Sequence, residues 1–147
     1  MEDATWGRPL DLSDLAADVD PSTPAIWTPE GTVTYGELVT LVRHQRSRLP
    51  DRRSLILLVV DNSLGSVVSY LACIASDLPT ILLPQGDDSF LSEVALQYDA
   101  NFIVDGPSGR VTHRSATEHK LHPGLQILLS TSGSTGSPKL VRLSKKN

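Results

Sequence analysis

Residues 55–83, LILLVVDNSLGSVVSYLACIASDLPTILL, decide the fold class of this chain. The aliphatic run at 55–60 has the length of a strand, and such an unbroken run is typical of a parallel strand that is covered on both faces. Asn62 or Ser63 can cap a helix that follows it. Apolar residues then recur at helical spacing, at Leu64, Val67, Val68, Leu71 and Ala75. A second aliphatic run at 80–83 completes a predicted strand–helix–strand unit.

The downstream sequence continues this alternation. Residues 89–98 predict a helix, because large side chains recur at every fourth position, at Phe90, Val94 and Tyr98. Strands are expected at 101–104 and 125–129, with a polar loop and room for one edge strand between 105 and 123. The predicted fold class is therefore α/β, with a largely parallel sheet flanked by helices.

The sequence before residue 55 divides into two parts. Residues 1–24 are rich in Asp and Pro and are predicted to be an N-terminal extension, whereas residues 25–147 form the α/β domain. A turn at 29–31 between two short β-prone runs predicts a hairpin. Thr34 and Glu37 then fit a capping box at the start of a helix. The apolar face of that helix is expected to comprise Leu38, Leu41, Val42 and Leu49.

Residues 130–139, STSGSTGSPK, follow the last apolar run and carry the chemistry of the chain. Gly133 and Gly136 allow backbone N–H groups to converge on one point without a Cβ atom in the way. The Ser and Thr hydroxyls are neutral donors that suit phosphate oxygens, and Lys139 adds a mobile positive charge. Because α/β folds bind nucleotide phosphates at the carboxyl ends of their strands, this segment is predicted to be a phosphate loop.

Two other interpretations of this loop fit less well. Its composition also suits a flexible Ser/Gly linker, but the order of its residues and the buried strand before it count against that interpretation. A P-loop of the Walker type needs a Gly directly before the Lys, and here Pro138 precedes Lys139.

Residues 131–139 resemble the signature phosphate loop of the adenylate-forming superfamily, which includes acyl-CoA synthetases, peptide-synthetase adenylation domains and luciferases. Leu140 departs from the family pattern, which usually has Gly at this position. Residues 32–38, TVTYGEL, resemble the T-Y-x-E-L start of the family's first helix. The aliphatic run at 55–60 is followed by Asp61, Asn62 and Ser63. This order resembles the strand of the family that is followed by the sequence Pro-Asn-Ser. The resemblance extends from about residue 21 to the end of the chain, and implies the N-terminal subdomain of such an enzyme.

The resemblance implies a ligase that activates a carboxylic acid with ATP, forming an acyl-adenylate and pyrophosphate, and then acylates the thiol of CoA or of a carrier protein. The acid could be a fatty, aryl or amino acid. The β- and γ-phosphates of ATP would be held by Thr131, Ser132, Gly133, Ser134, Thr135, Gly136 and Lys139. These residues would orient ATP and stabilise charge on the leaving pyrophosphate, a charge that Mg²⁺ would share. The family's catalytic lysine and acid pocket lie downstream, so no catalytic residue is expected here.

The composition narrows the possible partners. Lys and Arg number 13 against 17 Asp and Glu, which argues against a nucleic-acid partner. No apolar run approaches the roughly 20 residues of a membrane span, and the N-terminus lacks the pattern of a signal peptide. Cys73 is the single cysteine, which fits a cytoplasmic protein without disulfides. The histidines at 113, 119 and 122 could be imagined as metal ligands, but the residues between them include no Cys and show no clear helical register. No metal site formed by protein ligands is therefore expected.

Two alternatives remain open beside the ligase. The chain could be a non-catalytic, truncated α/β module that acts through a partner. It could also be a flavodoxin-like binding module whose Ser/Gly loop is a coincidence. In the ligase interpretation the chain is a fragment that is expected to be inactive by itself. A reading frame that continues past Asn147 would favour the ligase, and a natural stop there would favour the non-catalytic module.

Overall fold

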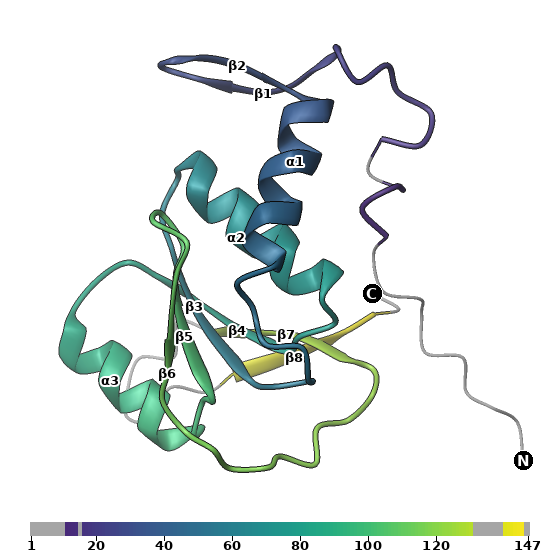
Figure 1. Ribbon diagram of the computed structural model, residues 1–147. Helices are drawn as coiled ribbons and strands as arrows, with labels where there is room; N and C mark the ends of the chain where they lie inside the picture. Colours follow the sequence, from purple (N-terminus) through teal and green to yellow (C-terminus); the bar gives the residue numbers. More distant parts are fainter. Residues whose placement is uncertain (1–10, 15, 131–139, 146–147) are drawn as a thin grey trace, which may run out of the picture.

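The computed structural model describes residues 11–14, 16–130 and 140–145, which form a mixed α/β fold (Figure 1). Its main sheet has six strands in the order β6-β5-β3-β4-β7-β8. These strands are β3 (Ile56–Val60), β4 (Thr80–Pro84), β5 (Phe102–Asp105), β6 (Arg110–His113), β7 (Leu125–Ser130) and β8 (Leu140–Ser144). The four central strands are parallel, whereas β6 and β8 pair antiparallel at the two edges. The predicted fold class is confirmed.

Three helices cover the two faces of this sheet (Figure 1). They are α1 (Tyr35–Arg46), α2 (Leu64–Ala75) and α3 (Asp88–Gln97). Alternate residues of β3 point to opposite faces, as a pleated strand requires. Ile56 and Leu58 pack in the cluster that contains the residues of α1 and α2, whereas Leu57 packs with Val94 of α3. Both faces of β3 are therefore buried, which explains its unbroken aliphatic sequence.

The starts of the helices follow the predicted capping chemistry. The Thr34 hydroxyl accepts a hydrogen bond from the Glu37 N–H at 3.3 Å, and the Glu37 carboxylate accepts one from the Thr34 N–H at 2.8 Å. This reciprocal pair confirms the capping box of α1. Ser63 caps α2, and Asp87 caps α3. A smaller hairpin, β1 (Pro24–Thr28) and β2 (Gly31–Thr34), precedes α1 as predicted.

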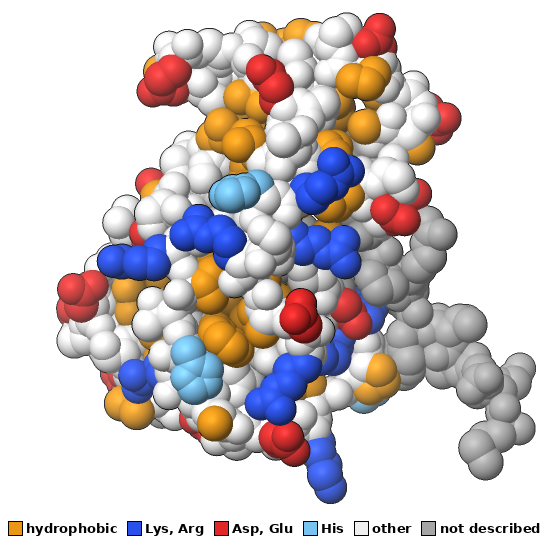
Figure 2. Space-filling model, viewed as in Figure 1, with side chains coloured by type: hydrophobic (Ala, Val, Ile, Leu, Met, Phe, Trp, Pro, Cys, Tyr) orange, Lys and Arg blue, Asp and Glu red, His pale blue; other side chains and the backbone are white. Residues whose placement is uncertain are grey.

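Several side chains depart from the positions that periodicity predicts. Leu41 of α1 and Val67 of α2 are 39% and 40% exposed, although helical spacing places both on buried faces. Phe90 at the start of α3 is also partly exposed, at 38%. Figure 2 shows hydrophobic side chains gathered below the hairpin, on the face that α1 and α2 form. No helix in the described part of the chain has the length and apolarity needed to cross a membrane.

Candidate functional site

The central strands of the sheet all end at one edge. Val60 at the end of β3 is in register with Pro84 at the end of β4, and Val59 is in register with Asp105 of β5. On the other side, Leu82 of β4 pairs with Leu129 of β7. The carboxyl ends of four parallel strands therefore lie together, and such an edge is where α/β folds bind ligands.

The predicted phosphate loop begins and ends at this edge. Ser130, the last residue of β7, is in register with Leu140, the first residue of β8. The intervening residues connect these two paired positions. All the predicted phosphate ligands, Thr131, Ser132, Gly133, Ser134, Thr135, Gly136 and Lys139, lie outside the described residues. What the structure describes is the frame at either end of the segment.

The part of the edge beside β3 and β5 is closed by close backbone packing. The Gly106 N–H donates to the Val59 carbonyl at 2.7 Å, and the Ser69 hydroxyl donates to the Gly106 carbonyl at 3.0 Å. A Cβ atom on Gly106 would lie 2.5 Å from the Val59 carbonyl oxygen, and one on Gly65 would overlap the Pro107 carbonyl. Only glycines fit at these two positions, where the β5–β6 turn packs directly against the end of β3 and the start of α2.

Asp61, which follows β3, stabilises the start of α2. Its carboxylate oxygen accepts hydrogen bonds from the Ser63 N–H at 2.9 Å and from the Ser66 hydroxyl at 2.8 Å. Hydrogen bonds from Ser63 and Ser66 hold the pKa of Asp61 below its usual value, so the side chain stays a carboxylate at neutral pH. Its role is that of a local cap.

The described residues that follow β4 at this edge are exposed. Residues 84–90, which run from the last residue of β4 through the connection to the first turn of α3, are exposed. The Gln85 N–H donates to the Val60 carbonyl at 2.7 Å and so extends the hydrogen bonding between β3 and β4 by one residue. Asp87 caps α3, and hydrogen bonds from the Ser89 N–H and hydroxyl lower the pKa of Asp87. The first turn of α3 thus carries negative charge, so an anion at this edge would depend on donors other than that helix end.

The exposed turn at 84–87 carries no signal in the sequence that marks it as part of a site. It becomes relevant because β4 is the neighbour of β7, from which residue 131 continues. No sequence signal fixes that adjacency, since the two strands are separated by α3, β5 and β6 along the chain.

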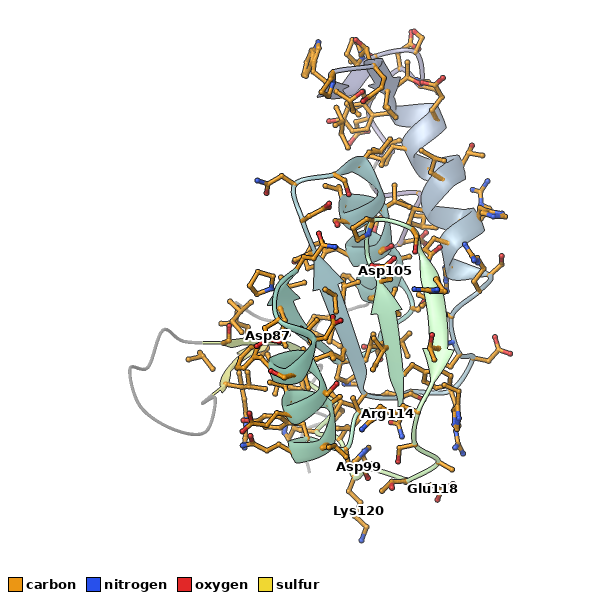
Figure 3. The ribbon with its side chains drawn as sticks, turned by 90° about the vertical axis from the view of Figure 1, so that its left-hand side faces the viewer. Asp87, Asp99, Asp105, Arg114, Glu118 and Lys120 are labelled. Carbon is orange, nitrogen blue, oxygen red and sulfur yellow. The ribbon has the colours of Figure 1, made fainter. Side chains whose placement is uncertain are left out.

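The opposite end of the sheet carries a different set of polar residues. In Figure 3, Asp87 and Asp105 lie toward the carboxyl ends of the strands, whereas Asp99, Arg114, Glu118 and Lys120 lie at the other end. The histidines at this lower end bind separate partners: His113 contacts the Phe102 ring, and His119 Nε2 lies 2.8 Å from the Asp99 carbonyl. The described residues include no group of three or more His, Cys, Asp or Glu side chains that could hold a metal ion.

Comparison with known proteins gives similarity in structure alone, because no protein-family model and no curated protein sequence matches the chain. VinN in complex with 3-methylaspartate superposes with a TM-score of 0.69 at 20% identity, over 95% of this chain and 49% of VinN. MatB from Rhodopseudomonas palustris gives a TM-score of 0.64 at 19% identity, over 91% of this chain and 34% of MatB.

The N-terminal subdomain of Klebsiella oxytoca NpsA, bound to 3-hydroxybenzoyl-AMSN, gives a TM-score of 0.65 at 17% identity, over 92% of this chain and 40% of that subdomain chain. The chain thus spans at most about half the length of these solved structures. All three are adenylate-forming enzymes, so the fold that the resemblance in the sequence implies is confirmed by an independent comparison of structures. The chain has the fold of the N-terminal subdomain of adenylate-forming enzymes.

Proposed function

We propose that this chain is part of an ATP-dependent ligase that converts a carboxylic acid into an acyl-adenylate. The observation that carries the proposal is the pairing of Ser130 with Leu140. It anchors both ends of the Ser- and Gly-rich segment at the carboxyl edge of a parallel sheet, where nucleotide phosphates bind in α/β folds. The similarity of the fold to adenylate-forming enzymes supports the same function.

In this proposal, the residues at 131–136 and Lys139 hold the β- and γ-phosphates of ATP. Their N–H groups and hydroxyls supply neutral hydrogen bonds, and Lys139 supplies charge. The described neighbours fit this assignment, because the turn at 84–87 is exposed and a Cβ atom on Gly86 would have only the Pro84 carbonyl, at 3.9 Å, within contact distance. Mg²⁺, bound with the nucleotide, would neutralise charge on the phosphates.

The acid and the acceptor are proposed by class. The comparison structures include complexes with L-aspartate, 3-hydroxybenzoyl-AMSN and methylmalonyl-CoA. An amino acid, an aryl acid and a short acyl acid are therefore the first substrates to test, with a fatty acid beside them. A thiol of CoA or of a carrier protein would accept the acyl group. An amino-acid-activating adenylation domain remains a variant of this proposal.

The second candidate is a non-catalytic α/β module that acts through a partner protein. The exposed hydrophobic side chains Trp27, Leu41 and Val67 favour it, because they lie on one face of the molecule. A non-catalytic module would bind its partner without a nucleotide or a carboxylic acid, and it would catalyse no ATP–pyrophosphate exchange.

The deciding experiment is carboxylate-dependent ATP–pyrophosphate exchange with the product of the complete reading frame. The acids are L-aspartate, 3-hydroxybenzoate, methylmalonate and a fatty acid. We expect exchange with one class, and we expect the 147-residue chain alone to show none. Lys139→Ala, or Ser134→Ala combined with Thr135→Ala, should abolish exchange.

Lys120→Ala is the matched control, because Lys120 is an exposed lysine at the opposite end of the sheet (Figure 3). It should leave exchange unchanged. A folded full-length protein that catalyses no exchange with any acid would instead support the non-catalytic module.

A further inference from the structure

Three neighbouring hollows that share lining residues lie on the face made by the hairpin, α1 and α2. The first, of about 620 Å³, lies between the hairpin and the start of α2, and the second, of about 400 Å³, lies between β2 and α1. The third, of about 210 Å³, lies between α1, α2 and the β5–β6 turn. Val33 lines the first and second hollows, Leu41 the second and third, and Leu64 the first and third. We refer to these three hollows together as the α1–α2 groove.

The α1–α2 groove has an apolar centre. Trp27 is 74% exposed, and Leu41 and Val67 are 39% and 40% exposed. All three line the groove, and they are half of the six large hydrophobic side chains that are exposed in the described part of the chain. Exposed apolar side chains gathered in one hollow are typical of a surface that another molecule covers.

The two ends of the groove carry opposite charge. Glu30 and Glu37 line the end at the hairpin, and no described Lys or Arg lines the first two hollows. Hydrogen bonds from Thr34 lower the pKa of Glu37, so that it stays ionised near neutral pH. His44 and Arg48 line the other end. Figure 2 shows this face, with a band of Lys, Arg and His side chains crossing it below the hydrophobic side chains.

We propose that the α1–α2 groove is a dimer interface in which a second copy of this chain binds about a two-fold axis. Such an axis places the acidic end of one copy against the basic end of the other and brings the two apolar centres together, so that the surface is complementary to itself. A membrane surface or a nucleic acid would require basic charge along the whole face, whereas this groove is acidic at the hairpin.

Sedimentation equilibrium of the full chain over a range of concentrations measures the proposed association. We expect a monomer–dimer equilibrium without larger species, because a two-fold interface is closed. Added salt should weaken the dimer by screening its charged ends. Trp27→Ala should raise the dimer dissociation constant without lowering the unfolding midpoint measured at concentrations where the chain is monomeric, because Trp27 is exposed in the monomer.

Charge reversal tests the pairing of the two ends. Glu30→Lys and Arg48→Glu should each raise the dimer dissociation constant by about ten-fold or more, because symmetry introduces each change twice. An equimolar mixture of the two variants should dimerise again, since the introduced lysine of one copy then faces the introduced glutamate of the other, while the unchanged Arg48 faces the unchanged Glu30. The double variant should dimerise with itself, because both of its charged ends are reversed together.

Glu93→Lys in α3 and Arg142→Glu in β8 are matched controls on exposed residues outside the groove. They should leave the dissociation constant unchanged. A chain that stays monomeric, a mixture of the two groove variants that does not associate, or oligomers that grow beyond the dimer would each overturn the proposal.

Discussion

Lys145 Nζ lies 2.6 Å from Asp77 Oδ1, and Arg53 Nη1 lies 2.6 Å from the same oxygen. Lys145 follows β8, Asp77 lies in the turn between α2 and β4, and Arg53 precedes β3. One carboxylate therefore connects three segments that are far apart in the sequence. The connection lies at the amino ends of the parallel strands, opposite the edge at which residues 131–139 begin.

Arg53 extends this network to the start of β7. Its Nη2 donates to the Leu125 carbonyl at 2.7 Å and to the His122 carbonyl at 3.1 Å, while Nη1 donates to the Asp77 carbonyl at 2.9 Å. Lys145 is bound through its backbone as well, because its N–H donates to the Gly124 carbonyl at 3.1 Å. The far ends of β7 and β8 are thus fixed to the rest of the sheet.

Arg53→Ala should lower the free energy of unfolding by about 2–4 kcal/mol, because it removes one of the two cations that bind the Asp77 carboxylate and the side-chain donor to the carbonyls of Asp77, His122 and Leu125. Lys145→Ala should cost about 1 kcal/mol, since Asp77 keeps Arg53. Urea unfolding measures both. The control is Arg52→Ala, whose ion pair with Glu118 is 68% and 83% exposed, and which should change stability by less than about 0.5 kcal/mol. Equal effects of Arg52→Ala and Arg53→Ala would contradict the network.

Gly65→Ala tests the close contact between α2 and the β5–β6 turn. Within a helix, replacing Gly by Ala normally stabilises by up to about 1 kcal/mol. Here the new methyl group would overlap the backbone carbonyl of Pro107, so we expect a loss of about 1–3 kcal/mol instead. Gly86→Ala is the control, because its Cβ would lie 3.9 Å from the nearest atom. Thermal unfolding shows whether the substitution stabilises or destabilises the chain. A Gly65→Ala protein that is more stable than the original would contradict the contact.

Local chemistry was readable from the sequence where one residue acts on its neighbours. Thr34 and Glu37 form the predicted capping box, and Ser63, one of the two predicted caps, is the N-cap of α2, because a cap depends on a few adjacent residues. The aliphatic run of β3 was equally clear, since both of its faces are buried.

Features that depend on distant packing were not readable. Leu41 and Val67 lie at helical spacing with buried residues, but they border the α1–α2 groove rather than the sheet. The edge strand β8 was missed because it pairs on one side only, with β7, and lacks a fully buried aliphatic run like that of β3. For the candidate site, the segment was found from its composition and order, whereas the adjacency of β4 to β7, the strand that ends at Ser130, depends on strand order.

The free energy of unfolding should fall at acid pH, and protonation of Glu37 should account for part of that fall. Hydrogen bonds from the Thr34 N–H and hydroxyl lower the pKa of Glu37 below its ordinary value of 4.5. The folded state therefore binds protons less readily than the unfolded state, so this contribution is present above pH 4.5 and is lost as the pH falls through the folded pKa. Glu37→Gln should flatten the decrease in the urea midpoint between neutral and acid pH. Glu93→Gln, an exposed substitution in α3, should leave the decrease as it is.

Cys73 should react with thiol reagents only when the chain unfolds. Its side chain is fully buried between α2 and the sheet, and burial raises its pKa to about 12 despite a hydrogen bond with Thr80. The thiolate, which is the reactive form, is therefore both scarce and inaccessible in the folded protein. Labelling with a coloured disulfide reagent should be negligible in buffer and should follow the urea unfolding curve. Complete labelling of the native protein within minutes would show that α2 separates from the sheet far more often than this packing implies.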